Sequence, residues 1–394
     1  MSIRIVHTAD NHVDLKYSKY RDAARQRLRQ ERFDSLSRVI DVANQRKAHV
    51  IVIAGDLFDQ QDLNSVGINR VTEVVSILAG FRGDCVLMLP GNHDFCAGSD
   101  SELWRRMKRE SEGHDNIVIL DSPEPYECTI NDHNVQFFPC PCPSKTSEQN
   151  VIGWVRGAEK SPSAVRVGIA HGNVEGLGLD TNDRYFNMTE TELATSGVHT
   201  WLLGHIHTPC PNVDSGSGHR NFFMAGSTTP ESVRRNSEGS VWIIDVDIDG
   251  VKAFERFRTG KVSFKRITRN FNATDQSAAI EALRNEINGL DAVNCVVDLQ
   301  LEGELGDGEL GELQILIQET ESAETGFIQA FVTNDVKRRL SEQQIADEFP
   351  SETRASELLI HLLESPNPED AAAALIAIRN LIGAGTQLRG GVRS

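Results

Sequence analysis

The amino-acid sequence predicts an α/β fold, and two patterns carry this prediction. Short runs rich in Val, Ile and Leu, such as Val50 to Ile53 and Val86 to Leu89, are typical of buried strands. Helical patterns alternate with these runs, most clearly in Phe33 to Ala43 and Val66 to Leu78. Strands that alternate with helices favour helices layered on central sheets.

Five apolar runs are each followed at once by side chains that bind metals. The runs are Ile3 to Val6, Val50 to Ile53, Val86 to Leu89, Val165 to Ala170 and Trp201 to Leu203. The segments that follow them are Asp10-Asn11-His12, Gly55-Asp56-Leu57-Phe58-Asp59, Gly91-Asn92-His93-Asp94, His171-Gly172 and Gly204-His205-Ile206-His207. Ligands of open α/β sheets bind at the carboxyl ends of the strands, so we expect these side chains to meet at one sheet edge.

The candidate ligands supply hard oxygens and imidazoles but no thiolate. They are Asp10, His12, Asp56, Asn92, His171, His205 and His207. This mixture suits Mn, Fe, Zn or Co better than Ca. Seven ligands exceed the needs of one four-coordinate ion but suit two divalent ions about 3.5 to 4 Å apart, with Asp56 as the bridging carboxylate. Two such ions activate water for displacement at phosphorus, so we expect phosphoester hydrolysis.

The five segments, in this order over residues 3 to about 230, resemble the signature of the calcineurin-like metallophosphoesterases. That signature reads D-x-H, G-D-x-x-D, G-N-H-D/E, H and G-H-x-H. The resemblance implies a four-layer α/β/β/α sandwich. It also implies that Asp10, His12, Asp56 and His207 bind one ion, and that Asp56, Asn92, His171 and His205 bind the other.

The same resemblance implies two catalytic residues that are not ligands. His93 would face the substrate and protonate the leaving oxygen or stabilise the transition state, and Asp59 would orient His93. Asp94 either orients His171 or a metal-bound water, or hydrogen-bonds its own turn. Asn11 is interpreted as structural or near the substrate, and the isolated histidines receive no role. These are His7, His49, His114 and His361.

Composition favours a cytoplasmic enzyme of two or three domains. The chain has 394 residues, more than one ordinary core holds. It shows no run of eighteen apolar residues, and Met1-Ser2-Ile3-Arg4 is polar, so we expect neither a membrane span nor a signal peptide. Seven cysteines suit a reducing compartment, and Cys140-Pro-Cys142 is expected to be a loop rather than a metal pair.

The net charge of −17 argues against non-specific binding of duplex DNA by this chain alone. The charges are unevenly distributed, however. Acidic residues gather between Glu302 and Glu324, whereas Lys16 to Arg32 is rich in Lys and Arg and directly follows His12. This basic segment could meet a polyanion or could form an ordinary solvated helix face.

The motifs divide the chain into three parts. We expect a catalytic domain over 1–264, a small α+β capping domain over 265–340, and C-terminal helices over 341–394 that fold back on the cap or dock on a partner. The expected elements after the last motif are closing strands (Phe222 to Ala225, Val241 to Val246), a helix (Ala278 to Ile287), two strands of the cap (Cys295 to Leu301, Gly326 to Val332) and two terminal helical segments (Ala355 to Leu363, Asp370 to Ile382).

This layout resembles the SbcD-type DNA repair exonuclease subunits, the nucleases of the double-strand-break repair complex. The resemblance implies DNA as the substrate, two Mn²⁺ ions, an SbcC-like coiled-coil ABC-type ATPase as partner, and a homodimer. Two departures stand out: Val13-Asp14 follows His12 where SbcD-type chains have Leu-Gly, and Asp59 stands where many archaeal and eukaryotic members have His. The alternatives are a phosphodiesterase or phosphatase for a nucleotide or other small phosphoester, and a non-catalytic DNA-end-binding scaffold.

Overall fold

The computed structural model describes residues 2–98, 101–177, 184–233, 238–272, 275–339 and 361. The chain divides into two compact units. The first comprises Met1–Ile267, Leu290–Asp298 and Glu321–Phe331, and the second comprises Thr268–Gly289, Leu299–Thr320 and the residues from Val332 onward. Three stretches of the expected cap, residues 265–267, Leu290–Asp298 and Glu321–Phe331, fall in the first unit. The predicted C-terminal helices lie outside the described residues, apart from His361.

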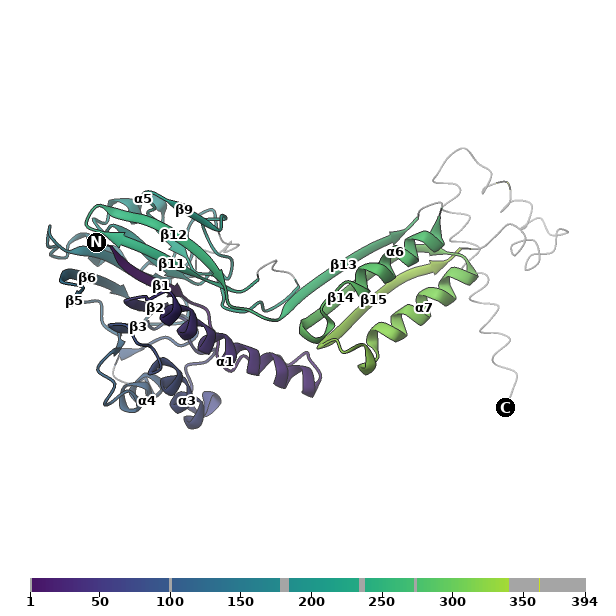
Figure 1. Ribbon diagram of the computed structural model, residues 1–394, viewed down its shortest axis with the longest axis horizontal. Helices are drawn as coiled ribbons and strands as arrows, with labels where there is room; N and C mark the ends of the chain where they lie inside the picture. The colour runs from purple at the N-terminus through teal and green to yellow at the C-terminus, as the bar shows by residue number, and fades with distance from the viewer. Residues whose placement is uncertain are drawn as a thin grey trace. The chain divides into compact units, whose positions relative to one another are not determined.

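Two sheets form the centre of the first unit (Figure 1). One has the order β4-β3-β2-β1-β11-β12-β9, and the other has the order β10-β8-β7-β6-β5. The strands of the first sheet are β1 (Ile3–Thr8), β2 (Val50–Ala54), β3 (Cys85–Leu89), β4 (Ile117–Ile119), β9 (Ser215–Ser217), β11 (Ser240–Asp247) and β12 (Gly250–Arg258). Those of the second are β5 (Tyr126–Ile130), β6 (His133–Cys140), β7 (Val165–His171), β8 (Thr200–Gly204) and β10 (Phe222–Met224).

The strands that carry the motifs run parallel. β1, β2, β3 and β4 pair in parallel within the first sheet. β6, β7, β8 and β10 do so within the second, and β11, β12 and β9 extend the first sheet antiparallel. Parallel neighbours end on the same side of a sheet, so the loops that follow β1, β2 and β3 emerge together, as do those that follow β7 and β8.

One hydrophobic core lies between the two sheets. Each sheet also packs against a further hydrophobic core on its outer face. Ile5 and Val52 of the first sheet pack with Ile169 and Leu202 of the second. Strands buried on both faces need apolar side chains at successive positions, which explains the continuous apolar runs in the sequence. Helices cover the outer faces of both sheets.

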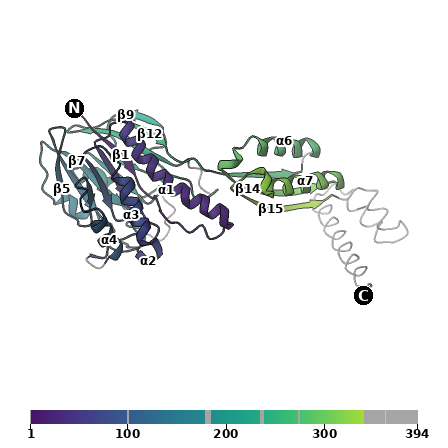
Figure 2. The ribbon, with the colours of Figure 1, turned by 60° about the horizontal axis from the view of Figure 1, so that its bottom comes forward.

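The outer face of the first sheet is covered by α1 (Asp22–Gln45), α3 (Ile68–Leu78) and α4 (Glu102–Glu110), which lie over one face in Figure 2. The outer face of the second is covered by the 3₁₀ helix Gly153–Arg156 and α5 (Glu190–Thr195). The layers are therefore α/β/β/α, and the predicted fold class is confirmed. No helix within the described residues combines the length and the apolar content needed to cross a bilayer.

Two helices differ from the prediction. α1 begins at Asp22, eleven residues before the predicted start, because Leu28 in its early turns packs on Val262, Phe264 and Val296. Because these partners are more than 200 residues away in the sequence, the residues around Leu28 show no local helical pattern that would mark the start of α1. The helix predicted over 66 to 78 is interrupted at Gly67, whose φ of 87° is incompatible with a continuous α-helix, so α2 (Leu63–Val66) ends there and α3 begins.

A three-stranded sheet with the order β13-β14-β15 forms the rest of the described chain. Its elements are β13 (Ser263–Phe271), α6 (Gln276–Asn288), β14 (Cys295–Leu305), α7 (Asp307–Glu321) and β15 (Gln329–Arg338). The sequence did not predict α7, because its acidic residues and two glycines obscure the buried positions Leu313 and Leu316. Ion pairs join α6 to its surroundings in the second unit, through Arg284 to Glu319 of α7 at 2.7 Å and through Glu286 to Arg269.

Candidate metal centre

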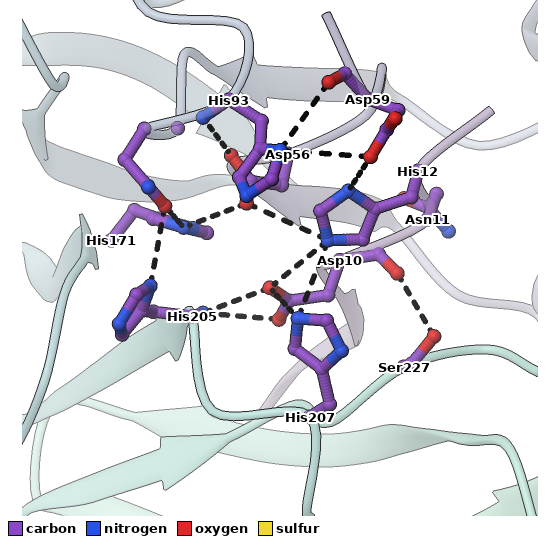
Figure 3. Close-up of polar contacts among 12 residues, drawn as sticks. Asp10, Asn11, His12, Asp56, Asp59, His93, His171, His205, His207 and Ser227 are labelled. Carbon is purple, nitrogen blue, oxygen red and sulfur yellow. Dashed lines mark hydrogen bonds and ion pairs between the residues drawn. The ribbon is translucent and has the colours of Figure 1, made fainter. Parts of the chain in front are cut away.

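All seven candidate ligands lie at the carboxyl ends of parallel strands. Figure 3 shows how the side chains of Asp10, His12, Asp56, His171, His205 and His207 gather in one place. β1 leads to Asp10 and His12, β2 to Asp56, and β3 to Asn92. In the second sheet His171 ends β7, while His205 and His207 follow β8. The structure thus brings together side chains from both sheets that are almost two hundred positions apart in the sequence.

Four of these residues have a left-handed backbone, which is unusual for residues other than glycine. The φ angles are 51° at Asp10, 43° at His12, 52° at Asp56 and 101° at His205. Each such conformation costs on the order of 1 to 3 kcal/mol, and such strain persists where surrounding bonds impose it. Here Asp10 N donates to Gly55 O at 3.1 Å, and His12 N donates to Asp56 O at 2.9 Å. The strained turns aim the side chains toward one another.

One set of donors, which we call the Asp10 group, consists of Asp10, His12 and His207. Nε2 of His207 lies 3.3 Å from Oδ1 of Asp10 and 3.3 Å from Nε2 of His12. The backbone N–H of His205 donates to both carboxylate oxygens of Asp10, at 3.1 and 3.0 Å, and so fixes that carboxylate. Two imidazole nitrogens and a carboxylate that converge in this way suit a shared cation.

The second set, which we call the Asn92 group, consists of Asn92, His171 and His205. Oδ1 of Asn92 lies 3.0 Å from Nε2 of His171 and 3.2 Å from Nδ1 of His205. Asp56 lies between the two groups, because its Oδ2 is 3.3 Å from Nε2 of His171 and 3.6 Å from Nε2 of His12. This is the place where the sequence expected a bridging carboxylate.

The donor atoms have the spacing of a metal site. Ligand atoms of Asp10, His12 and His207 lie within 4.8 Å of one another, and so do those of Asp10, Asp56 and His171. Asp56 is 1% exposed, and both Asp10 and His171 are fully buried. Buried carboxylates and imidazoles of this kind are stable when a cation balances them, so the residues fit two divalent ions.

The electrostatics agree with this fit. Burial opposes the ionised form of Asp56, but His171 and His12 outweigh it and hold the pKa of this carboxyl far below its usual range. Asp56 is therefore a carboxylate at neutral pH. Its second oxygen, Oδ1, accepts a hydrogen bond from the backbone N–H of His93 at 2.8 Å, which leaves Oδ2 directed at the two donor groups.

His93 and Asp59, the predicted catalytic pair, lie together at the edge of the site. Nδ1 of His93 is 3.3 Å from the carbonyl oxygen of Asp59 and 3.6 Å from its Oδ1. The same Oδ1 lies 3.3 Å from Nδ1 of His12. Asp59 thus serves both histidines, a double contact that the sequence did not predict. Burial opposes ionisation of Asp59, but hydrogen bonds with His12 and His93 hold the pKa of its carboxyl below the usual range.

Asp94 and Asn11 have structural partners. Oδ1 of Asp94 accepts a hydrogen bond from Gly91 N at 2.7 Å, and Oδ2 accepts one from Phe58 N at 3.0 Å. Of the two interpretations for Asp94, these contacts favour the one in which it holds its own turn. Asn11 is fully buried and its amide approaches the hydroxyls of Thr8 and Thr228, at 3.4 and 3.3 Å, as its structural interpretation requires.

The basic segment from Lys16 to Arg32 is largely paired within the chain. Arg25 pairs with Asp22, and Arg29 pairs with Asp14 at 2.5 Å. Arg32 is fully buried against Glu231. Lys16, Lys19 and Arg21 are exposed. Neither sequence-based interpretation, a polyanion surface or a solvated helix face, describes all of this segment.

The sequence did not predict the groups that hydrogen-bond the candidate ligands and so orient them. Nδ1 of His207 lies 2.6 Å from Oε2 of Glu231, and Nδ1 of His171 lies 2.8 Å from the carbonyl oxygen of Ala54. The amide of Asn92 donates to the carbonyl oxygen of Lys145 at 3.3 Å. Glu231 stands alone after Pro230 and has no motif around it, so no pattern in the sequence marks it.

Comparisons with known proteins agree with the geometry. A family model described as calcineurin-like phosphoesterase matches residues 3–209. The uncharacterized metallophosphoesterase YhaO of Bacillus subtilis is 23% identical over 343 residues, which cover 83% of this chain and 80% of that protein. The DNA double-strand break repair protein Mre11 of Aeropyrum pernix is 22% identical over 253 residues, which cover 62% of this chain and 58% of that protein.

Two solved structures show distant similarity. TT1561 of Thermus thermophilus has a TM-score of 0.41 at 11% identity and covers 66% of this chain and 100% of its own. A dimetal phosphatase from Danio rerio has a TM-score of 0.36 at 13% identity and covers 66% of this chain and 98% of its own. The family model spans more than half of the chain and includes every candidate ligand. The chain belongs to the calcineurin-like phosphoesterase family and is, by that membership, a metal-dependent hydrolase.

Proposed function

We propose that this protein is a two-metal phosphodiesterase that cleaves DNA, as an exonuclease or an end-processing endonuclease of repair or recombination. The observation that carries the chemistry is the convergence of seven donors in two groups, with Asp56 between them. Asp10, His12, Asp56 and His207 would hold one ion, and Asp56, Asn92, His171 and His205 the other. Bound divalent ions, for which we propose Mn²⁺, supply Lewis-acid activation of water and neutralise charge at phosphorus.

The chain supplies the proton chemistry through His93. Its side chain is 36% exposed, so a substrate can reach it, whereas that of Asp56 is 1% exposed. Burial opposes the protonated form of His93, but the contacts with Asp59 and Asp56 raise its pKa above the usual value. A protonated imidazole held in this way can donate to a leaving alkoxide, while Asp59 keeps the ring in place.

Three observations support DNA as the substrate. The relative from Aeropyrum pernix is named a DNA double-strand break repair protein. The site lies at the ends of two sheets, and His93 at its edge is exposed enough to meet a bulky phosphodiester. A small α+β unit follows the catalytic one, as in the SbcD-type layout. By the same resemblance, we propose an SbcC-like ABC-type ATPase partner and a homodimeric assembly.

A small phosphoester is the second candidate. The observations that favour it are the net charge of −17 and the internal pairing of Arg25, Arg29 and Arg32, which reduce the positive surface that a polyanion needs. A nucleotide or another small phosphodiester needs only the site itself.

The test is to assay the protein in Mn²⁺ with end-labelled linear DNA and, in parallel, with bis(p-nitrophenyl) phosphate. Hydrolysis of both at rates abolished by EDTA supports the proposal. Hydrolysis of the chromogenic ester while the DNA remains uncleaved favours a small phosphoester as the substrate. Binding of DNA ends without turnover of either substrate would make the protein a scaffold rather than an enzyme.

A further inference from the structure

A half-buried carboxylate, that of Glu231, contacts the ring of His207 on the side away from the other donors. Nδ1 of His207 donates to Oε2 of Glu231 across 2.6 Å. The other ring nitrogen, Nε2, lies 3.3 Å from Oδ1 of Asp10 and 3.3 Å from Nε2 of His12. A histidine whose Nδ1 carries the proton presents an unprotonated Nε2, so the bond to Glu231 directs the Nε2 lone pair into the Asp10 group.

Glu231 is itself held by Arg32 of α1. The guanidinium of Arg32 is fully buried and makes three hydrogen bonds of 2.8 Å, to the Tyr17 hydroxyl, the Asn11 carbonyl oxygen and Oε1 of Glu231. Each carboxylate oxygen of Glu231 therefore has a different partner, Oε1 with Arg32 and Oε2 with His207. Rotation of Glu231 breaks a charged hydrogen bond to a buried guanidinium, so Glu231 keeps its orientation and fixes the ring of His207.

We propose that Glu231 and Arg32 are positioning residues that set the metal affinity of the Asp10 group. Both act through His207, Glu231 by selecting its tautomer and ring angle and Arg32 by orienting Glu231. This inference rests on the two-metal function proposed above and deepens it, since it predicts that the two ions respond differently to one substitution.

A glutamine at position 231 separates these roles, because an amide has only one accepting oxygen. If that oxygen faces His207, the amide N–H₂ is directed at the Arg32 guanidinium, where two donors oppose each other. If the oxygen faces Arg32, the N–H₂ faces Nδ1 of His207, which must then accept and carry its proton on Nε2. Either arrangement disturbs the Asp10 group and leaves the Asn92 group untouched.

The experiment is calorimetric titration of Mn²⁺ into the metal-free full chain and its Glu231→Gln variant. We expect two ions in the unsubstituted protein. In the variant, one ion should bind about 10- to 100-fold more weakly and the other should be unchanged, as for substitutions behind metal ligands elsewhere. Saturating Mn²⁺ should restore most of the turnover, because every ligand remains.

Glu31→Gln is the matched control. Glu31 is 1% exposed on the same helix as Arg32, pairs with Arg38 and contacts no candidate ligand. Its replacement removes a comparable buried ion pair, and both Mn²⁺ affinities should stay the same. If Glu231→Gln does not fold, Arg32→Lys can replace it. This variant keeps the charge but loses the forked hydrogen bonds, and it should lower the affinity for one Mn²⁺ ion by a smaller factor.

The outcomes separate this inference from the proposed function. An unsubstituted protein that binds fewer than two Mn²⁺ ions contradicts the two-metal function itself. Two ions in the unsubstituted protein, with identical affinities in the folded Glu231→Gln or Arg32→Lys variant, overturn the positioning role alone. An equal decrease in both Mn²⁺ affinities also overturns the positioning role, because a general loss of structure would then explain the change.

Discussion

His93 differs from the seven candidate ligands in exposure and in the partners of its ring. Its side chain is 36% exposed, and Nδ1 faces Asp59 rather than the two donor groups. Asp59 Oδ1 is also 3.3 Å from Nδ1 of His12, which belongs to the Asp10 group. A substitution at His93 should therefore affect proton transfer alone, whereas one at Asp59 should affect both proton transfer and metal binding.

His93→Ala should keep both ions and lower kcat by on the order of 10² to 10⁴, since a general acid is lost while the charge at phosphorus stays neutralised. Asp59→Asn should give a smaller loss of kcat and should also lower the affinity for one of the two ions. The measurement is steady-state kinetics with metal analysis, with the exposed His114→Ala as control. Loss of one ion from His93→Ala would reassign His93 as a ligand.

The convergence of the seven candidate ligands could be predicted because each lies at or just after the end of a strand that the sequence marks clearly. Glu231 and Arg32 could not be predicted in this way. Arg32 looked like one charge of a basic segment, and its burial depends on a carboxylate 199 positions away. Side chains that hold ligands from behind are defined by distant partners, which a single sequence does not reveal.

At the scale of elements, the turn after β3 must pass very close to the turn after β2. A Cβ placed on Gly91 would lie 2.2 Å from Oδ1 of Asp56 and 2.3 Å from its backbone nitrogen. Only a residue without a side chain fits there. The G-N-H-D segment thus needs its glycine to let Asp56 occupy the place between the two donor groups.

Gly91→Ala should displace Asp56, destabilise the protein by on the order of 1 to 3 kcal/mol and reduce bound metal below two ions. The measurements are urea unfolding and metal content after dialysis. Gly153→Ala is the control, because a Cβ at Gly153 meets nothing within 4 Å. A Gly91→Ala protein with full metal content would show that the turn can shift without moving Asp56.

His7 of β1 links the two sheets. Its Nε2 lies 3.1 Å from the carbonyl oxygen of Leu203 in β8 and 3.3 Å from that of Phe223 in β10. Burial lowers the pKa of His7 to about 4. No functional role is expected for this histidine from its place in the sequence, and the structure places it in the core as a hydrogen-bond donor between the sheets.

Stability should therefore fall as the pH is lowered from about 6.5 to 4. Over this range the unfolded chain protonates His7, at an ordinary pKa of about 6.5, while the folded protein does not. The loss amounts to roughly 3 kcal/mol, since one pKa unit corresponds to about 1.4 kcal/mol. Urea unfolding in EDTA at pH 7 and pH 4.5 should show a larger decrease for the unsubstituted protein than for His7→Gln. Equal decreases would mean that His7 protonates in the folded state.

At the scale of the whole molecule, the layers could be predicted from the sequence, whereas the division into compact units depends on long-range packing. The four layers follow from strands buried on both faces, which the apolar runs reveal. The boundary does not follow from any local pattern, because Leu290–Asp298 and Glu321–Phe331 belong to the first unit through packing of residues such as Val296 on Tyr17 and Leu28. Long-range packing of this kind cannot be read from a single sequence.

The proposed partner can be tested by removing residues 350–394. This segment carries apolar side chains at helical spacing, among them Leu358, Leu362 and Ile376. The truncated protein should still hydrolyse bis(p-nitrophenyl) phosphate and should fail to co-purify with the proposed ATPase. Insoluble protein, or loss of cooperative unfolding, would assign the segment to the core of this chain instead.

The measurement that tests the two-metal function most directly is the Mn²⁺ content and turnover of Asp56→Asn, with Asn92→Ala beside it. Asp56 Oδ2 approaches both His12 and His171, so its loss should abolish activity and remove much of the metal. Asn92→Ala removes a ligand of one group only, so it should keep more metal. An Asp56→Asn protein with two ions and near-normal hydrolysis of a phosphodiester would contradict the two-metal function.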